Sequence, residues 1–161
     1  TTDAPGKNEF AQQYIEGENY SVSLVMSRVV GEACLYFSGN PPLVLAVNRQ
    51  DVTVGPDGAF SYHGGETPVH PAREQEIIDT AKKAATVLGC QGYCGIDVIL
   101  ADQVYVVDVN PRITTSLVGI AACMKEEIAE LLVNASKGTG PDAVHLEGRV
   151  KFDTHGKVTR V

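Results

Sequence analysis

The stretch from residue 92 to residue 112, GYCGIDVILADQVYVVDVNPR, decides the fold of this chain. It holds two runs rich in β-branched and aromatic residues, 92–100 and 104–109, separated only by residues 101–103. Such runs favour strands, and a connection this short joins antiparallel neighbours. The sequence therefore predicts a β-hairpin here.

Polar side chains with oxygen atoms interrupt these apolar runs. Asp108 and Asn110 share one face of their strand, because side chains alternate along a strand, and the hairpin can place Asp97 across from Asp108. Carboxylates on a half-buried sheet are costly unless a cation or hydrogen bonds compensate. Mg²⁺ takes one or two carboxylates together with substrate phosphates. Alternatively, Asp108 and Asn110 are only turn residues before a proline and Asp97 belongs to a surface ion pair.

Two arginines are candidates for holding an anion. Arg112 follows the rigid Pro111 and can reach a phosphate or carboxylate with two parallel hydrogen bonds. Arg49 ends an apolar run and could grip a substrate carboxylate or a γ-phosphate, or it could be a solvated arginine at a strand end. The hydroxyl residues 114–116 predict a helix N-cap, which beside phosphates would also serve anions.

The rest of the chain predicts further strands and helices. Apolar alternation and turn signals predict strands over residues 20–30, 33–37, 43–48, 143–152 and 157–161. A helical apolar period predicts helices over 74–88 and 125–137, and one more beginning near 114–116. Residues 51–71 are interpreted as a strand plus a long binding loop, in which Gly64 and Gly65 either admit a ligand close to the backbone or form a simple turn. Together these elements predict an α+β fold, a mainly antiparallel sheet packed with two to three helices.

Composition limits the class of protein. The chain has 161 residues and a formal net charge of −7, which argues against a nucleic-acid surface because such a surface needs a basic stripe. No apolar run approaches the roughly 18 to 20 residues that span a bilayer. Cys90 and Cys94 do not have Cys-x-x-Cys spacing, so we expect reduced structural cysteines in a cytoplasmic protein rather than a disulfide or a metal site.

The hairpin resembles the end of an ATP-grasp domain. The matching strings are Ile-Asp-Val at residues 96–98 and Val-Asp-Val-Asn-Pro-Arg at residues 107–112. In that family, an acidic residue on one strand and an acidic-x-Asn triplet on the next bind the magnesium ions that bridge ATP phosphates. The resemblance implies that Asp97, Asp108 and Asn110 bind Mg²⁺, or Mn²⁺, although the family more often has Glu where Asp108 stands.

A second string, FAQQYIEG at residues 10–17, resembles the ATP-grasp hinge strand, whose backbone pairs with adenine. The resemblance implies that the main chains of Gln13 and Ile15 meet adenine, with Gln12 nearby. Either of the next two polar residues would meet the ribose, and these are Glu18 and Asn19.

The resemblance narrows to the archaeal tyramine–glutamate ligase group of methanofuran biosynthesis, on residues 20–24, 47–50, 64–68 and 110–116. It implies an ATP-dependent carboxylate–amine ligase that forms an amide through an acyl phosphate, with glutamate and an amine as substrates in one-carbon cofactor biosynthesis. Arg112 and Arg49 would stabilise the transferring group. The implied partners are ATP and the small carboxylate and amine substrates, with a homodimer as one option.

ATP-grasp enzymes clamp ATP between two halves, and the first half carries lysines and a glycine-rich loop. The nine residues before the hinge string cannot hold that half or a substrate domain. We therefore expect residues 1–161 to be the C-terminal part of an ATP-grasp domain, with the remainder in cis or in another chain. The alternatives are a non-catalytic nucleotide-binding or interaction module, and a different ATP-grasp reaction such as carboxylation.

Overall fold

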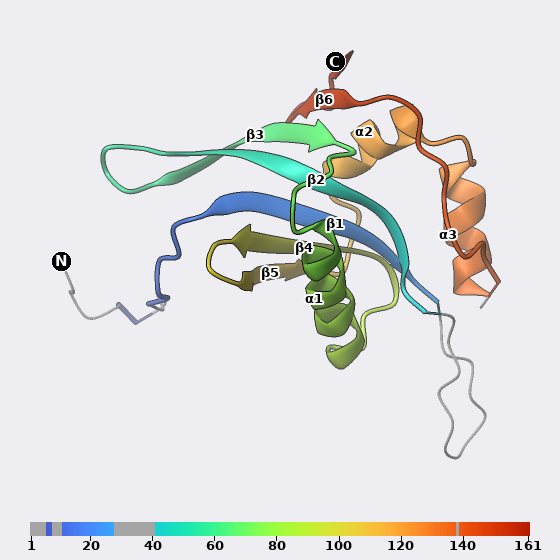
Figure 1. Ribbon diagram of the computed structural model, residues 1–161, viewed down its shortest axis with the longest axis horizontal. Helices are drawn as coiled ribbons and strands as arrows, with labels where there is room; N and C mark the ends of the chain where they lie inside the picture. Colours follow the sequence, from blue (N-terminus) through green and yellow to red (C-terminus); the bar gives the residue numbers. More distant parts are fainter. Residues whose placement is uncertain (1–5, 8–10, 28–40, 138) are drawn as a thin grey trace.

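The computed structural model describes residues 6–7, 11–27, 41–137 and 139–161 (Figure 1). The elements of this part of the chain are β1 (Glu18–Met26), β2 (Leu43–Val54), β3 (Phe60–Thr67), α1 (Glu74–Val87), β4 (Gly92–Leu100), β5 (Val104–Asn110), α2 (Ser116–Cys123), α3 (Ile128–Ser136), β6 (Val150–Asp153) and β7 (Val158–Arg160). The predicted strand over 33–37, and the last residues of the strand predicted over 20–30, lie outside the described residues.

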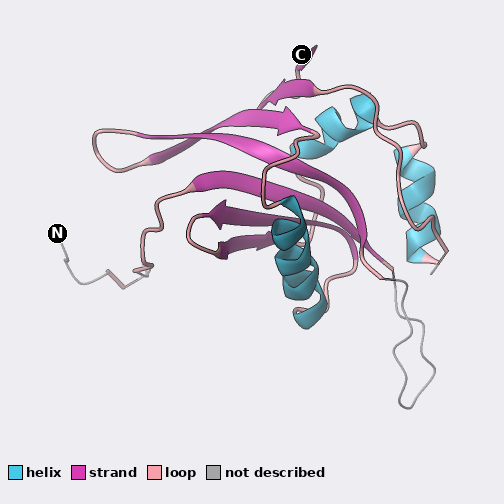
Figure 2. Cartoon of the chain, in the orientation of Figure 1, coloured by secondary structure: helices cyan, strands magenta, loops and turns pink. Residues whose placement is uncertain are grey.

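The strands form one sheet in the order β5-β4-β1-β2-β3-β6-β7, and every neighbouring pair is antiparallel (Figure 2). This arrangement confirms the predicted α+β fold with a mainly antiparallel sheet. Within the described residues, no helix combines the length and the apolarity that crossing a bilayer would require.

Helix α1 covers one face of the sheet. Its buried residues Ile77, Ala81 and Ala85 recur every fourth position, which gives the helix a single apolar stripe. This stripe packs against residues of the central strands, among them Val22 and Ile96, in one core cluster. Burying Ile77, Val22 or Ile96 contributes on the order of 1.5–3 kcal/mol each, so this cluster stabilises the contact of α1 with the centre of the sheet.

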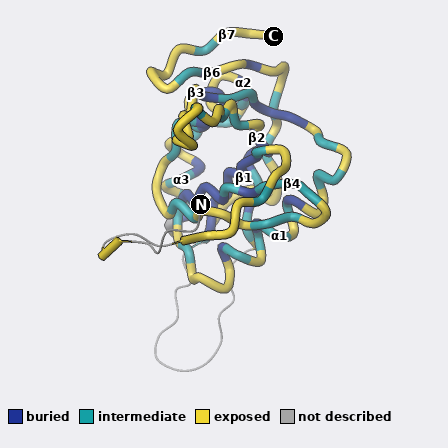
Figure 3. The backbone as a smooth tube through the Cα atoms, turned by 90° about the vertical axis from the view of Figure 1, so that its left-hand side faces the viewer, coloured by how far each residue is buried: buried dark blue, intermediate teal, exposed yellow. Residues whose placement is uncertain are grey.

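Helices α2 and α3 cover part of the opposite face. Ile120 of α2 and Leu131 of α3 pack with Val25 and Tyr93 in a second core cluster. Val25 and its neighbour Leu24 belong to different clusters, because adjacent strand residues point to opposite faces. The buried segments accordingly lie in the central strands, whereas β7 at the sheet edge is largely exposed (Figure 3).

The structure corrects the predicted loop over residues 51–71. Strand β2 continues to Val54 instead of ending at Asn48, and β3 returns beside it. The tight connection is closed by the Gly55 N–H, which donates to the Ala59 carbonyl at 2.8 Å, and Gly58 adopts a φ of 82°. The outer part of this hairpin projects away from the core (Figure 1), so its side chains need no apolar pattern and resemble a loop in sequence.

Residues 143–149 also differ from the prediction, because β6 begins only at Val150. Leu146 forms an isolated bridge with Met124, and the Lys125 N–H donates to the His145 carbonyl at 2.9 Å. These backbone groups therefore pair with the connection between α2 and α3 rather than with a strand. The predicted hairpin of β6 with β7 is confirmed.

The cysteines in the described residues are free thiols, as expected: Cys90, Cys94 and Cys123. Cys94 is fully buried in the core beneath α1, where it acts as a small apolar residue. Cys34 lies outside the described residues.

A bulge in the hairpin changes which way β3 side chains point. Asp51 pairs with Gly64, but the next β2 residue, Val52, pairs with Tyr62, so His63 is an extra residue. Gly64 takes a φ of 120° at this point, a conformation that favours glycine. The extra residue reverses the alternation, so Tyr62 faces away from the α1 side of the sheet.

The glycine pair lies within β3 and serves strand packing, which corrects the alternative of a simple turn. A Cβ atom on Gly64 would overlap the Phe152 carbonyl, and one on Gly65 would overlap the Arg49 carbonyl. The backbones of β6 and β2 therefore fill the space of a side chain at either glycine, whereas a ligand contact at Gly65, which lines a pocket of about 300 Å³, stays a prediction.

Gly65→Ala is predicted to lower the free energy of unfolding by about 2–4 kcal/mol, because the added methyl group must displace backbone rather than a flexible side chain. Urea denaturation of both proteins measures the change. The matched control is Gly140→Ala, where an added Cβ meets nothing within 4 Å. Equal stability of the two variants would contradict this account of the glycine pair.

Candidate functional site

The three predicted oxygen ligands lie together at one end of β4 and β5. Asp97 pairs with Asp108, and Gly95 pairs with Asn110. The Asn110 Nδ2 donates to Asp108 Oδ2 at 2.9 Å and to Asp97 Oδ2 at 3.3 Å. The cluster expected from the hairpin register is therefore present as a geometric arrangement.

Two further side chains hold this cluster in place. Gln50 of β2 donates from Nε2 to Asp97 Oδ1 at 3.0 Å. Arg112 donates from Nη2 to Asn110 Oδ1 at 3.1 Å and from Nη1 to the Ile113 carbonyl at 3.2 Å. Since Arg112 is exposed, its guanidinium keeps donors free for an anion beside the carboxylates.

The environment of Asp97 disfavours its negative charge. Burial is the main cause, and the charge of Asp108 adds to it, so the pKa of Asp97 rises to about 6. The hydrogen bond from Gln50 and the charge of Arg112 act in the opposite direction. A divalent cation between the carboxylates would remove the remaining cost, and oxygen donors of this kind suit Mg²⁺ or Mn²⁺.

The cluster opens into a pocket of about 410 Å³. The pocket lies on the sheet face opposite α1, on the part that α2 and α3 do not cover. Asp97, Asp108 and Arg112 line one side of it, and the hydroxyl residues 114–116 line another. Tyr62 also borders the pocket, from the β2–β3 hairpin. Charged, hydroxyl and aromatic groups thus converge on one space.

A network of hydroxyl groups forms the floor of this pocket. The buried Tyr93 hydroxyl donates to Ser23 Oγ at 2.9 Å and shares a hydrogen bond with Thr114 Oγ1 at 2.9 Å. Ser116 Oγ lies 2.9 Å from Thr114 Oγ1 and 3.2 Å from Ser23 Oγ. The N-cap residue of α2, Thr115, makes no side-chain capping bond, so these hydroxyls hold one another instead of capping the helix as predicted.

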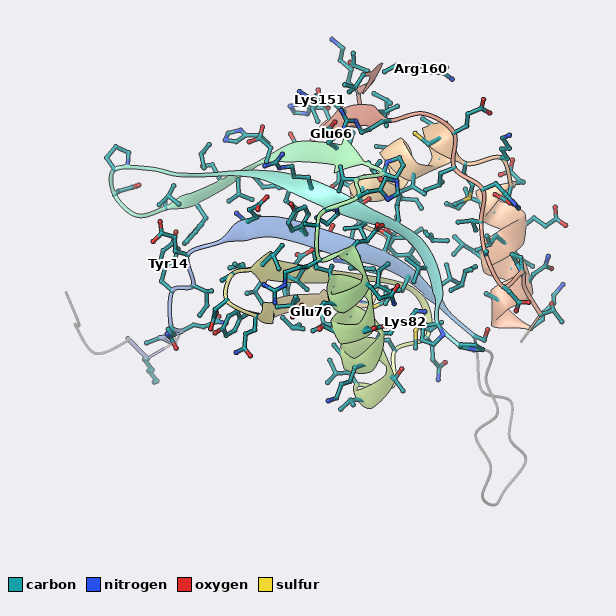
Figure 4. The ribbon with its side chains drawn as sticks, viewed as in Figure 1. Tyr14, Glu66, Glu76, Lys82, Lys151 and Arg160 are labelled. Atoms are coloured by element: carbon teal, nitrogen blue, oxygen red, sulfur yellow. The ribbon has the colours of Figure 1, made fainter. Side chains whose placement is uncertain are left out.

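A second pocket, of about 330 Å³, lies at the hinge string. Four of the predicted nucleotide residues line it, namely Gln12, Gln13, Ile15 and Asn19. Its remaining walls are mostly apolar and include Ile99 and Val107. At its rim the Tyr14 ring, labelled in Figure 4, lies 6.1 Å from the Phe60 ring.

The two pockets form one groove, because Val52 and Phe60 line both of them. The groove is apolar at the hinge end and rich in oxygen atoms at the carboxylate end. A ligand with a flat apolar group joined to an anionic group has the matching chemistry.

Two predicted residues lie outside this groove. Glu18 accepts from the Tyr20 hydroxyl at 2.7 Å and lies 3.6 Å from the Arg49 guanidinium. Arg49 lines a separate pocket of about 300 Å³ with Glu66 and Lys151, whose proximity is visible in Figure 4. Because Gln50 turns its side chain to Asp97, its neighbour Arg49 must point to the other face.

Several groove residues were missed by the sequence analysis. Ile99 could have been found by alternation, since it shares a face of β4 with Asp97. Val107 had no such signal, because it is the extra residue of a bulge in β5 and alternation from Asp108 would turn it to the other face. Gln50 required the knowledge that β2 continues past Asn48. Tyr62 had no signal, because a bulge decides its direction.

The chain is similar to proteins of known family. Residues 1–116 match the ATP-grasp domain family. Tyramine–L-glutamate ligase of Methanocaldococcus fervens is 32% identical over 128 residues, which cover 79% of this chain and 38% of that protein. The enzyme of the same name from Methanocaldococcus jannaschii is 33% identical over 129 residues, which cover 79% of this chain and 36% of that protein. The chain thus spans under two fifths of the length of these curated relatives.

Solved structures share the fold. An ATP-grasp superfamily protein from Archaeoglobus fulgidus is 28% identical with a TM-score of 0.62, covering 88% of this chain and 40% of that chain. L-amino acid ligase from Bacillus licheniformis is 17% identical with a TM-score of 0.68, and the match covers 86% of this chain and 35% of that chain. The second likeness concerns the fold alone.

Asp97→Asn is predicted to raise the free energy of unfolding at pH 7 in metal-free buffer by on the order of 2 kcal/mol. The folded pKa of Asp97, about 6, lies above its ordinary value of 3.8, so the ionised carboxylate destabilises the fold. The wild type should therefore lose stability as the pH rises from about 4 to about 6, and the variant should lack that loss. Urea denaturation across this range measures it, with the exposed Asp142→Asn as control. A pH profile shared by wild type and Asp97→Asn would contradict the assignment.

Proposed function

Because the chain belongs to the ATP-grasp family, we propose that its groove holds Mg-ATP and supplies the metal-binding half of a carboxylate–amine ligase. The observation that carries this proposal is the continuity of the groove from the hinge string to the carboxylate cluster. Adenine occupies the apolar end and the phosphates occupy the oxygen-rich end.

At the nucleotide end, the main chains of Gln13 and Ile15 contact the edge of adenine, with Gln12 nearby. Ile99 and Val107 supply apolar surface for its faces. The side chains of Ile99 and Val107 would bury the adenine base without adding charge to the site.

For the ribose we propose Asn19 and not Glu18. Asn19 lines the hinge pocket, whereas Glu18 is hydrogen bonded to Tyr20 and faces Arg49. An amide side chain can both donate to and accept from ribose hydroxyls.

At the phosphate end, Asp97, Asp108 and Asn110 hold Mg²⁺, with Mn²⁺ as a substitute. The described residues contain no cluster of three or more His, Cys, Asp or Glu side chains that could hold a metal, so the nucleotide phosphates are proposed as further ligands. When bound, the ion neutralises phosphate charge and orients the γ-phosphate.

The reaction we propose has two steps. A carboxylate oxygen of the substrate attacks the γ-phosphorus, the bridging bond to ADP breaks, and an acyl phosphate forms. The amine nitrogen then attacks the acyl carbon, a C–N bond forms, inorganic phosphate leaves and the amine loses a proton. Arg112 stabilises the transferring phosphoryl group, since its exposed guanidinium adjoins the metal ligands.

Arg49 has no part in this proposal, because it opens onto the other face of the sheet. Its predicted role in the transfer stays a prediction. The cytoplasmic location and the homodimer also stay predictions.

The proposed substrates are L-glutamate and an aromatic amine such as tyramine, in the biosynthesis of a one-carbon cofactor. The names of the relatives from two Methanocaldococcus species support the two substrates, and the role in cofactor biosynthesis stays a prediction. Since the chain spans under two fifths of their length, we propose that the lysine-bearing clamp half belongs to the same polypeptide or to another chain.

The enzyme class is tested by ADP release from the longest natural polypeptide that contains this chain. With Mg-ATP and L-glutamate present, tyramine should stimulate ADP release and amide formation. Stimulation by bicarbonate instead of an amine would indicate carboxylation. Mg-ATP binding without stimulation by any acid would indicate a binding module.

Asp108→Ala is predicted to weaken Mg-ATP binding at least about tenfold, because the ion loses a carboxylate ligand. Calorimetry with this chain, with and without Mg²⁺, measures the affinity. Asp102→Ala is the matched control, because Asp102 lies in the turn at the far end of the same hairpin, where it accepts from Tyr105. Equal Mg-ATP affinity of wild type and Asp108→Ala would remove Asp108 from the metal site.

Asn19→Ala is predicted to weaken binding of Mg-ATP about 3- to 10-fold, the value of one or two hydrogen bonds. It should leave binding of Mg-triphosphate, which lacks ribose, unchanged. Glu18→Ala, one residue away, should change neither affinity. Calorimetry with both ligands distinguishes the two residues, and a larger effect of Glu18→Ala would reverse their assignment.

A further inference from the structure

Tyr62 projects into the groove from the strand opposite the metal ligands. It lies on β3, whereas Asp97 and Asp108 lie on β4 and β5, at the other side of β1 and β2. All three nevertheless line the same pocket. The β2–β3 hairpin therefore brings an aromatic side chain across the groove toward the cluster.

The backbone is built to give Tyr62 this direction. Without the extra residue His63, the alternation of β3 would turn Tyr62 to the same face as Gly64 and Glu66, on the α1 side. A bulge that redirects one side chain is often found beside an active site. Here it adds a phenol to the pocket that Asp97, Asp108 and the hydroxyl residues 114–116 also line.

The hydroxyl of Tyr62 is available for a ligand. Among the described residues it has no hydrogen-bond partner, whereas the hydroxyl of the buried Tyr93 is bound to Ser23 and Thr114. Burial and the nearby charge of Asp97 raise the pKa of Tyr62 to about 12. The group is therefore a neutral O–H donor throughout the physiological range.

The position of this donor relative to the cluster narrows what it can meet. One side of the pocket carries the proposed metal ligands and Arg112, and the floor carries residues 114–116. Phosphate oxygens at the metal already have cationic partners there. The substrate carboxylate next to the γ-phosphate has two oxygens. One of them forms the bond to phosphorus, and the other becomes the carbonyl oxygen, which needs a hydrogen-bond donor.

We propose that Tyr62 is a substrate-contacting residue whose hydroxyl donates a hydrogen bond to the carbonyl oxygen of the acyl phosphate. This assignment rests on the proposed function of the groove. The carbonyl oxygen gains negative charge when the amine nitrogen attacks the acyl carbon, and it loses that charge when phosphate leaves. A donor fixed beside it stabilises the transition state more than the bound carboxylate.

The test is Tyr62→Phe, which keeps the ring and removes only the hydroxyl. In the longest natural polypeptide that contains the chain, kcat for amide formation from L-glutamate and tyramine should fall at least about tenfold. The KM for ATP should change less than about twofold. Tyr105→Phe, which removes an exposed hydroxyl bonded to Asp102, is the control and should behave as wild type.

A kcat for Tyr62→Phe equal to that of wild type overturns the assignment. A loss of Mg-ATP affinity as large as the loss of kcat also overturns it, because Tyr62 would then act on the nucleotide. If the wild type shows no glutamate-dependent ADP release, this assignment falls together with the proposed substrate. The Mg-ATP affinities of wild type and Asp108→Ala, measured separately, still report on the proposed nucleotide site.

Discussion

The pairing of Asp97 with Asp108 across β4 and β5 is the constraint on which the site depends. It places two carboxylates and the amide of Asn110 within hydrogen-bond distance, although burial raises the pKa of Asp97 to about 6. The free energy for holding this unfavourable arrangement comes from the apolar residues around it, which pack under α1. The sheet is therefore a rigid support for a cluster that would not assemble without it.

The β2–β3 hairpin supplies the opposite wall of the groove. Its outer part is exposed on both faces, so its position depends on backbone pairing and on the close contact of the two glycines with β2 and β6. The bulge at His63 then selects which side chains reach the groove. One wall thus depends on side-chain burial and the other depends on backbone geometry.

The difference between these walls explains how far the sequence could predict the site. Asp108 and Asn110 share a face through strand alternation, which is a local property, and one extra residue, Val107, brings that face into line with Asp97. Arg49 was placed with them by the family resemblance, but it pairs with Tyr20, which in turn pairs with Val98, so its side chain lies on the face opposite Asp97. Tyr62 depends on one unpaired residue, and no residue pattern announces a bulge.

The hydroxyl floor beneath the groove has a property that a charged floor would lack. In the contacts joining Ser23, Ser116, Thr114 and Tyr93, four of the hydrogen bonds can run in either direction. Each hydroxyl can turn its proton without moving a heavy atom. Thr114 and Ser116, which line the pocket, are thus rotatable dipoles that can reorient when the charge of a bound ligand changes, while the buried Ser23 and Tyr93 exchange hydrogen bonds behind them.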